Sequence, residues 1–252
     1  MVKISTSARS PLSLTRWPSD AFVWWRSLVV LFTLGAAFVV AQMLQLTWLS
    51  ATHAHVDPRK LVLNWNILAL QLAVYAPVLP ALLTGLHWAA QRPLREVGMR
   101  LPTTFEATIG VTGGLAAYAI TMAISLVQTA LTHVRPEQQV VDALSGAHDP
   151  TIIAAFAFFA CVLAPFVEET AFRGFLFNAI YRYTPLWLAA ALSGLLFAMS
   201  HGSRSALVPL WAVGIILAFV YQRTGTLAAS MIAHGTFNVT NVILIVAAHQ
   251  TS

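Results

Sequence analysis

Long apolar stretches separated by short connectors run through the 252-residue sequence and restrict what it can fold into. Hydrophobic residues make up 58% of the chain, whereas Asp, Glu, Lys and Arg together make up only 9%. A soluble domain carries about 25% of these charged residues, so the composition excludes a water-soluble enzyme, a disordered chain and a disulfide scaffold. Apolar stretches of about 18 residues or more are typical of helices that span a bilayer. The sequence therefore predicts a polytopic membrane protein.

We expect about seven membrane segments, joined by connectors that contain proline or glycine. These segments cover residues 21–49, 61–90, 105–131, 151–182, 186–201, 205–222 and 226–248. An eighth segment results if one of the long stretches breaks at Pro77, Pro80 or Pro165. Because backbone groups in lipid must find hydrogen-bond partners within the protein, the segments are expected to be helices. The predicted fold class is all-α, a polytopic transmembrane helical bundle that forms one integral membrane domain.

The chain begins with a polar arm at residues 1–20, which contains three basic residues and no acidic residue before Asp20. A cleaved signal peptide is the alternative interpretation, but the apolar run that follows is long enough to be retained as a membrane helix. We divide the rest of the chain into N-terminal membrane segments at 21–150 and C-terminal membrane segments at 151–248.

Basic residues are distributed unevenly between the two sets of connectors. One set holds nine of them: Lys3, Arg9, Arg16, Arg26, Arg92, Arg95, Arg100, Arg182 and Arg223. The positive-inside rule therefore places the N-terminus in the cytoplasm. We expect an integral protein of the bacterial inner cell membrane. The basic residues form no patch interleaved with aromatic residues, so we expect the lipid bilayer as a partner and no nucleic acid.

The strongest polar signal within an apolar segment is the run Glu168-Glu169-Thr170-Ala171-Phe172-Arg173. Charged groups at membrane depth are costly and are functional candidates by default. On a helix, Glu169 and Arg173 are four residues apart on one face and can pair. Glu168 points about 100° away and has no such local partner, which suits a general base or acid. A buried ion pair that joins two helices is the alternative; it explains Glu169 and Arg173 but not Glu168.

Two later segments carry polar residues at comparable depth. Glu168 and His201 are each 16.5 positions from the midpoint of the turn between their segments, so an antiparallel helix hairpin places them at the same depth. His234 and Asn238 lie one helical turn apart on one face of the last segment, and their side chains can donate hydrogen bonds to a developing oxyanion. His234 taken alone is better explained by packing, but the three polar clusters together indicate a shared site.

In this order and spacing, the three clusters resemble the motifs of the CaaX protease and bacteriocin-processing family of intramembrane endopeptidases, which is related to the Ras-converting CaaX endopeptidase. That family has a Glu-Glu-x-x-x-Arg motif, then Phe-x-x-x-His, then His-x-x-x-Asn or Asp. The matching runs here are residues 168–173, 197–201 and 234–238. The resemblance covers about residues 151–248 and nothing in the first three segments. It implies an α-helical bundle with a conical cavity open to the cytosol and the membrane.

The resemblance also implies roles for the site residues. Glu168 would be the base that activates water, and His201 would help to hold that water. His234 and Asn238 would stabilise the oxyanion.

The resemblance further implies that Glu169 and Arg173 organise the site. Because the HExxH motif of common zinc proteases is absent, we expect no cofactor. Two glutamates and two histidines can also form a metal site, so a divalent metal such as zinc stays an alternative.

The expected function is that of an intramembrane endopeptidase that hydrolyses peptide bonds of membrane-associated or peptide substrates with a glutamate-activated water. Prenylated partners are not expected in bacteria, so transmembrane proteins or peptide toxins are the expected substrates. One alternative is a non-hydrolytic bacteriocin-immunity or membrane scaffold protein with the same fold. Another is a proton-coupled transporter, but the sequence has no inverted repeat and no second polar cluster along a path through the membrane.

Overall fold

The computed structural model describes residues 24–52, 63–90, 98–133 and 149–250, together with Arg95, Leu144 and Ala147. The predicted arm at residues 1–20 lies outside the described residues. Within them, every regular element is a helix, so the predicted all-α class is confirmed.

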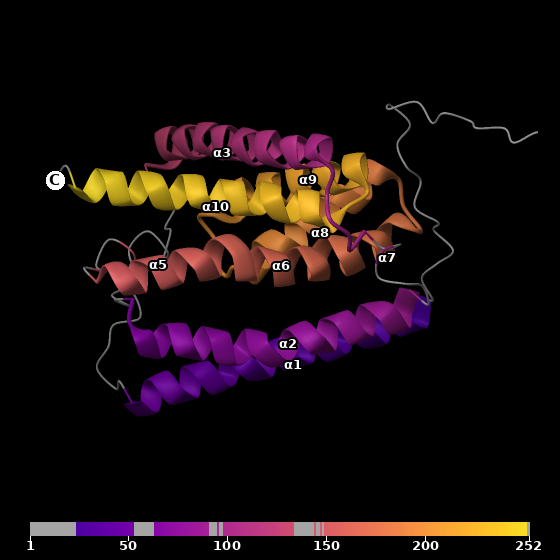
Figure 1. The fold of residues 1–252 in the computed structure, drawn as a ribbon, viewed down its shortest axis with the longest axis horizontal. Coiled ribbons are helices and arrows are strands. Elements are labelled where there is room, and N and C mark those ends of the chain that lie inside the picture. The colour runs from indigo at the N-terminus through magenta and orange to yellow at the C-terminus, as the bar shows by residue number, and fades with distance from the viewer. Residues whose placement is uncertain are drawn as a thin grey trace, which may run out of the picture.

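Seven helical rods follow one another along the described chain, one for each predicted membrane segment (Figure 1). The first three are α1 (Trp24–Thr52), α2 (Trp65–Ala90) and α3 (Thr104–Thr132), and the last three are α8 (Leu186–Ser200), α9 (Leu207–Thr224) and α10 (Leu227–Gln250). Between them lies one long helix made of α5 (Pro150–Phe158), η3 (Phe159–Leu163), α6 (Ala164–Glu169), η4 (Thr170–Phe177) and α7 (Asn178–Tyr181), in which η3 and η4 are π-helical. The chain stays helical through Pro77, Pro80 and Pro165, so no break at these prolines creates an eighth segment.

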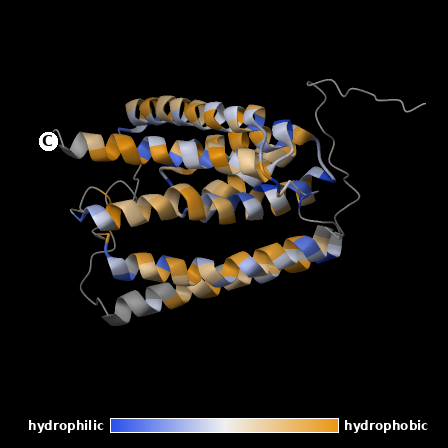
Figure 2. Cartoon of the chain, viewed as in Figure 1, coloured by the Kyte–Doolittle hydropathy of each residue, from blue (hydrophilic) through white to orange (hydrophobic). Residues whose placement is uncertain are grey.

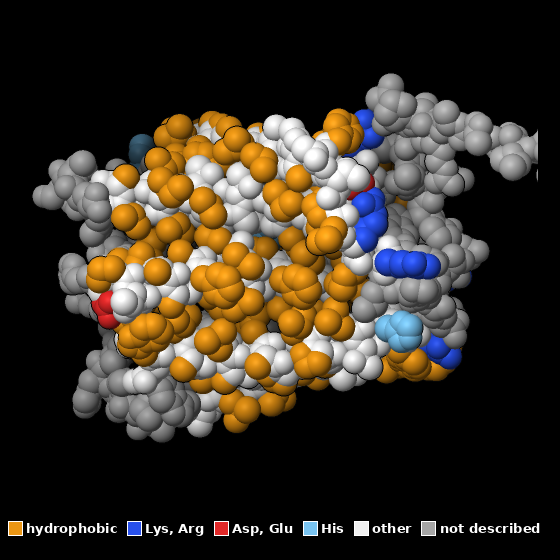
Figure 3. Space-filling model, viewed as in Figure 1, with side chains coloured by type: hydrophobic (Ala, Val, Ile, Leu, Met, Phe, Trp, Pro, Cys, Tyr) orange, Lys and Arg blue, Asp and Glu red, His pale blue; other side chains and the backbone are white. Residues whose placement is uncertain are grey.

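Five helices among the described residues are long and apolar enough to cross a membrane: Leu68–Ala89, Thr104–Thr132, Pro150–Tyr181, Leu207–Thr224 and Leu227–Ala247. Apolar side chains cover the middle of the molecule, and the charged side chains lie toward its two ends (Figure 3). Large apolar residues such as Phe32 and Leu131 are each 77% exposed. Because exposed apolar patches of this extent are unfavourable in water, the bundle is that of an integral membrane protein.

The rods form layers with the long helix in the middle (Figure 1). On one side of it lie α8, α9, α10 and α3, and α10 packs along α3 while α8 packs along α9. On the other side α2 packs against α6 and η4, and α1 packs on α2. Hydropathy is high along most of each rod, and hydrophilic residues are frequent near the rod ends (Figure 2). The polar residues of the middle helix are therefore enclosed between two layers of helices.

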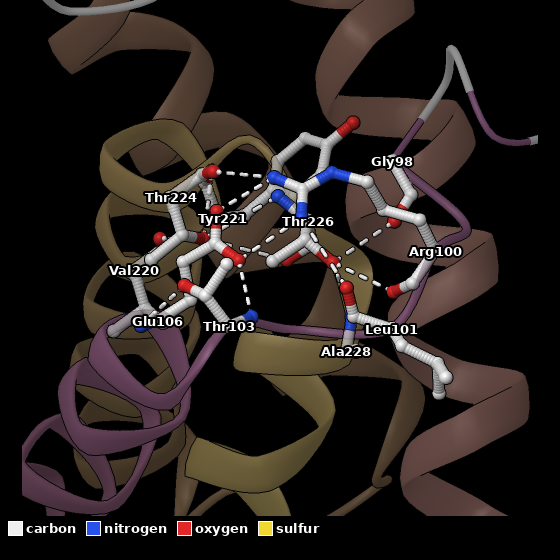
Figure 4. Close-up of polar contacts among 10 residues, drawn as sticks. All are labelled: Gly98, Arg100, Leu101, Thr103, Glu106, Val220, Tyr221, Thr224, Thr226 and Ala228. Carbon is white, nitrogen blue, oxygen red and sulfur yellow. Dashed lines mark hydrogen bonds and ion pairs between the residues drawn. The ribbon is translucent and has the colours of Figure 1, made fainter.

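A polar cluster fixes the start of α10, the helix that carries two of the predicted site residues (Figure 4). The Thr226 hydroxyl, in the turn between α9 and α10, hydrogen-bonds with the carbonyl oxygens of Gly98 and Arg100, 3.1 Å from each. The Arg100 guanidinium forms an ion pair with Glu106 at 2.6 Å, and Glu106 forms a capping box with Thr103 at the start of α3. These contacts tie α3 to α10 at one end of the bundle.

The described basic residues gather mainly at that same end of the molecule (Figure 3). Because consecutive rods are antiparallel, the starts of α1 and α3 and the ends of α2, α7 and α9 lie at one end of the bundle. The basic residues beside these helix ends are Arg26, Arg95, Arg100, Arg182 and Arg223. Asp149, which caps the N-terminus of α5, and Arg204 belong to the opposite end. The cytoplasmic location of the basic end stays a prediction.

Candidate active site

A π-helical turn, η3, directly precedes the α-helical stretch α6 that carries the two glutamates. In η3 the Ala164 N–H bonds to the Phe159 carbonyl, so the next carbonyl, that of Ala160, lacks its donor because Pro165 has no N–H. The Asn238 amide on α10 replaces that donor, with 2.6 Å between Asn238 Nδ2 and the Ala160 oxygen. Such π-helical turns occur frequently at functional sites. Asn238 therefore joins α10 to the helix that carries Glu168.

Close contact between α10 and this turn depends on Gly235. A Cβ atom added at Gly235 would lie 2.6 Å from the Cys161 carbonyl oxygen, which real structures do not tolerate. Glycine at this position lets the α10 backbone approach the π-helical turn. His234, the preceding residue, is thereby held against the long helix.

The predicted pair between Glu169 and Arg173 is confirmed. Arg173 Nη1 donates to Glu169 Oε1 at 2.8 Å, and both side chains are completely buried. Arg173 Nη2 donates to the Gly214 carbonyl on α9 at 2.9 Å, and the guanidinium carbon lies 4.6 Å from the centre of the Phe197 ring. A buried charge needs this degree of pairing and hydrogen bonding to be tolerated. The pair links the long helix to α9 and, through Phe197, to α8.

Glu169 also accepts hydrogen bonds from two residues of α10. His234 Nδ1 lies 2.9 Å from Glu169 Oε1, and the Ser230 hydroxyl lies 2.5 Å from Glu169 Oε2. Ser230 was not predicted from the sequence, although it is a polar residue one helical turn before His234 on the same face. Both oxygens of Glu169 are therefore engaged by buried partners.

The contact with Glu169 determines which nitrogen of His234 carries hydrogen. A carboxylate can only accept hydrogen bonds, so Nδ1 is the protonated nitrogen. His234 Nε2 lies on the other side of the ring, 4.0 Å from Glu168 Oε2. In the neutral ring Nε2 is an acceptor, and in the imidazolium ion it is a donor. His234 is thus placed between the two neighbouring carboxylates.

Glu168 differs sharply from Glu169 in its surroundings. Its Oε1 accepts a hydrogen bond from the Tyr75 hydroxyl on α2 at 3.2 Å. Its Oε2 is buried and has no hydrogen-bond partner among the described residues, while the side chain as a whole is 19% exposed. The expectation that Glu168 has no partner on its own helix is confirmed. Tyr75 was not predicted, because a single tyrosine in an apolar segment gives little signal.

His201 caps the C-terminal end of α8, the second helix of the predicted hairpin. Its Nδ1 donates to the Phe197 carbonyl, 2.8 Å away, which leaves Nε2 as an acceptor in the neutral ring. The Phe197 ring contacts both imidazoles, with centroids 4.7 Å from His201 and 5.6 Å from His234. Within the described chain, no hydrogen bond or ion pair joins His201 to Glu168. The structure thus brings His201 near the site without direct contact.

A metal ion does not fit the donor atoms of this site well. Both Glu169 oxygens already accept hydrogen bonds, from Arg173, His234 and Ser230. No group of three or more His, Cys, Asp or Glu side chains in the described part of the chain is arranged to hold a metal. We therefore derive no chemical step that uses one.

Comparisons with known proteins match the part of the chain that contains this site. Residues 150–240 match the Type II CAAX prenyl endopeptidase Rce1-like family. The resemblance predicted from the three motifs is confirmed over this region. We call residues 150–240 the Rce1-like region; it contains all six predicted site residues, whereas Tyr75 lies outside it.

Individual relatives match a similar part of the chain. The putative membrane peptidase YdiL of Bacillus subtilis is 31% identical over 33% of this chain, and the membrane-embedded CAAX protease MroQ of Staphylococcus aureus is 34% identical over 32% of it. An uncharacterized 24.3 kDa protein of Escherichia coli is 35% identical over 29% of this chain. The chain spans only about a third of the length of these relatives, 34% for YdiL and 36% for the other two. No solved structure matches this chain.

Proposed function

We propose that this protein is an intramembrane endopeptidase that hydrolyses peptide bonds with a water molecule activated by Glu168. The observation that carries the proposal is the buried Glu168 Oε2, which has no hydrogen-bond partner among the described residues and lies 4.0 Å from His234 Nε2. A water molecule at the usual hydrogen-bond distance of about 2.8 Å from both atoms fits this separation. The similarity of the Rce1-like region to CAAX endopeptidases supports the same reaction class.

Glu168 acts first as a general base and then as a general acid. It takes one proton from the water while the water oxygen attacks the carbonyl carbon of the scissile bond. The tetrahedral intermediate carries a negative oxygen. Glu168 then gives its proton to the amide nitrogen as the C–N bond breaks, which releases a new carboxyl terminus and a new amino terminus.

Hydrogen-bond donors around Glu168 stabilise the negative oxygen of the intermediate. His234, as an imidazolium ion whose Nδ1–H is held by Glu169, donates from Nε2. Asn238 uses one amide hydrogen for the Ala160 carbonyl and has a second for the intermediate. The two fixed donors, His234 and Asn238, act strongly because the apolar surroundings screen them little. His201 acts instead as an acceptor, because its Nε2 accepts a hydrogen bond from the attacking water.

Glu169 and Arg173 serve as the scaffold of the site in this proposal. Glu169 holds the orientation and hydrogen position of His234, and Arg173 neutralises the Glu169 charge within the apolar core. The proposed mechanism uses no metal ion, and both Glu169 oxygens are engaged by protein donors.

Substrates are membrane-associated proteins or peptides that reach the site within the bilayer. The relatives with a stated activity are membrane peptidases by name, which supports cleavage of peptide bonds by a membrane protein. The basic end of the bundle then faces the cytoplasm.

A non-hydrolytic immunity or scaffold protein is the second candidate. The fully buried network of Glu169, Arg173 and Ser230 favours it, because such a network stabilises the bundle whether or not a substrate is cleaved. A protein of this kind does not need Glu168.

The test is a mass-spectrometric census of the termini of membrane proteins and secreted peptides in cells that carry wild-type protein or Glu168→Gln. Termini present only with the wild type, at equal amounts of both proteins, support proteolysis and identify candidate substrates. Identical termini would overturn the endopeptidase proposal in favour of the scaffold function.

A further inference from the structure

Tyr75 connects Glu168 to a helix outside the Rce1-like region. Its hydroxyl lies 3.2 Å from Glu168 Oε1, although the two residues are 93 positions apart in the sequence. Its ring packs edge-on against Phe159, with centroids 5.0 Å apart and planes at 73°. Phe159 is buried with Leu68 and Ala164 in one apolar cluster, against which Tyr75 packs. The phenol is therefore held in place by apolar contacts while its hydroxyl reaches the carboxylate.

Because of the hydrogen bond from Tyr75, the two carboxylate oxygens of Glu168 differ in their hydrogen bonding. An ionised carboxylate only accepts hydrogen bonds, so the hydroxyl donates and Oε1 is occupied. Oε2 then keeps its lone pairs and faces His234 Nε2. The terminal torsion of a glutamate is broad, so without a fixed donor the carboxylate can rotate away from this orientation.

We propose that Tyr75 is a positioning residue that orients the Glu168 carboxylate toward the water that it activates. This inference rests on the proposed endopeptidase function. Tyr75 acts through Glu168 and does not itself touch the reacting atoms. The N-terminal membrane helix α2 thus completes a site whose other members all belong to the Rce1-like region.

The kinetic test compares Tyr75→Phe with Tyr118→Phe in the 252-residue protein. Tyr75→Phe keeps the ring that packs on Phe159 and removes only the hydroxyl. Tyr118 lies on α3, and its hydroxyl makes no hydrogen bond with any described residue, so it serves as the matched control. Tyr75→Phe should lower kcat of the folded protein about 10- to 100-fold, because hydrogen bonds to charged groups are worth about that factor. KM should stay at the wild-type value.

A merely structural tyrosine gives a different pattern, in which Tyr75→Phe lowers the melting temperature and leaves kcat of the folded protein unchanged. That pattern would overturn the inference. Full activity of Tyr75→Phe together with loss of activity in Glu168→Gln would overturn it while the endopeptidase proposal stands. Cleavage that survives Glu168→Gln would overturn both.

A spectroscopic measurement tests the contact without relying on activity. With 3-fluorotyrosine placed at position 75, Glu168→Leu should shift the fluorine resonance, because the phenol loses its carboxylate acceptor. The same substitution should leave the resonance of 3-fluorotyrosine at position 118 unchanged. An unchanged signal at position 75 would overturn the inference.

Discussion

His234 Nδ1 lies 2.9 Å from the carboxylate of Glu169, and this contact separates two glutamates that are adjacent in the sequence into different structural environments. Glu169 is completely buried and engaged at both oxygens. Glu168 lies on the opposite side of the same imidazole, with one oxygen bonded to Tyr75 and the other without a partner among the described residues. The geometry supports a scaffold role for Glu169 and a chemical role for Glu168.

Arg173→Ala should destabilise the protein strongly. The substitution leaves the buried Glu169 without its charge partner, and breaking a buried ion pair in this way costs about 3–5 kcal/mol. Unfolding in detergent micelles, followed by circular dichroism, measures the change. Arg204→Ala is the control, since this arginine is exposed and such surface substitutions change stability by about 0.5 kcal/mol or less. Equal effects of the two substitutions would mean that the pair contributes nothing to the fold.

Asn238→Ala should also destabilise the bundle, by roughly 1–3 kcal/mol, because it removes the donor for the Ala160 carbonyl. Asn241→Ala is the matched control on the same helix. The Asn241 amide donates to the Phe237 carbonyl of its own helix, so its loss should matter less. The measurement is the free energy of unfolding of each of the two variants. If Asn238→Ala is no more destabilising than Asn241→Ala, Asn238 does not hold the π-helical turn.

Cleavage should not depend on a bound metal ion. Incubation with the chelators EDTA and 1,10-phenanthroline should leave the cleavage rate unchanged, since both Glu169 oxygens are occupied by protein donors. Measuring the rate before and after chelation, with zinc added back, checks this expectation. Loss of activity that zinc restores would contradict a metal-free mechanism.

Interactions within one helix could be predicted from the sequence. The Glu169–Arg173 pair follows from the four-residue spacing of a helix, and the structure has it. The seven apolar segments likewise correspond to seven rods, because stretches of this length and hydropathy form helices in a membrane. Local spacing also indicated that Glu168 has no partner on its own helix.

Contacts between helices could not be predicted in the same way. Helical spacing does not specify which helix faces Glu168, so the contact with Tyr75 from α2 was missed. Ser230 was missed because a lone hydroxyl in an apolar helix commonly bonds to its own backbone, as Thr240 does with the Thr236 carbonyl. Pro165 suggested a break, but the helix continues because Asn238 supplies the donor that proline lacks.

The role of Glu168 in activating water is tested by the cleavage rates of wild-type protein and Glu168→Gln in lipid vesicles. Both proteins are reconstituted at equal folded concentration with a substrate identified from the termini census. We expect Glu168→Gln to lower the rate by about 100-fold or more, with an unchanged melting temperature. Cleavage by Glu168→Gln at the wild-type rate would show that Glu168 is not the base.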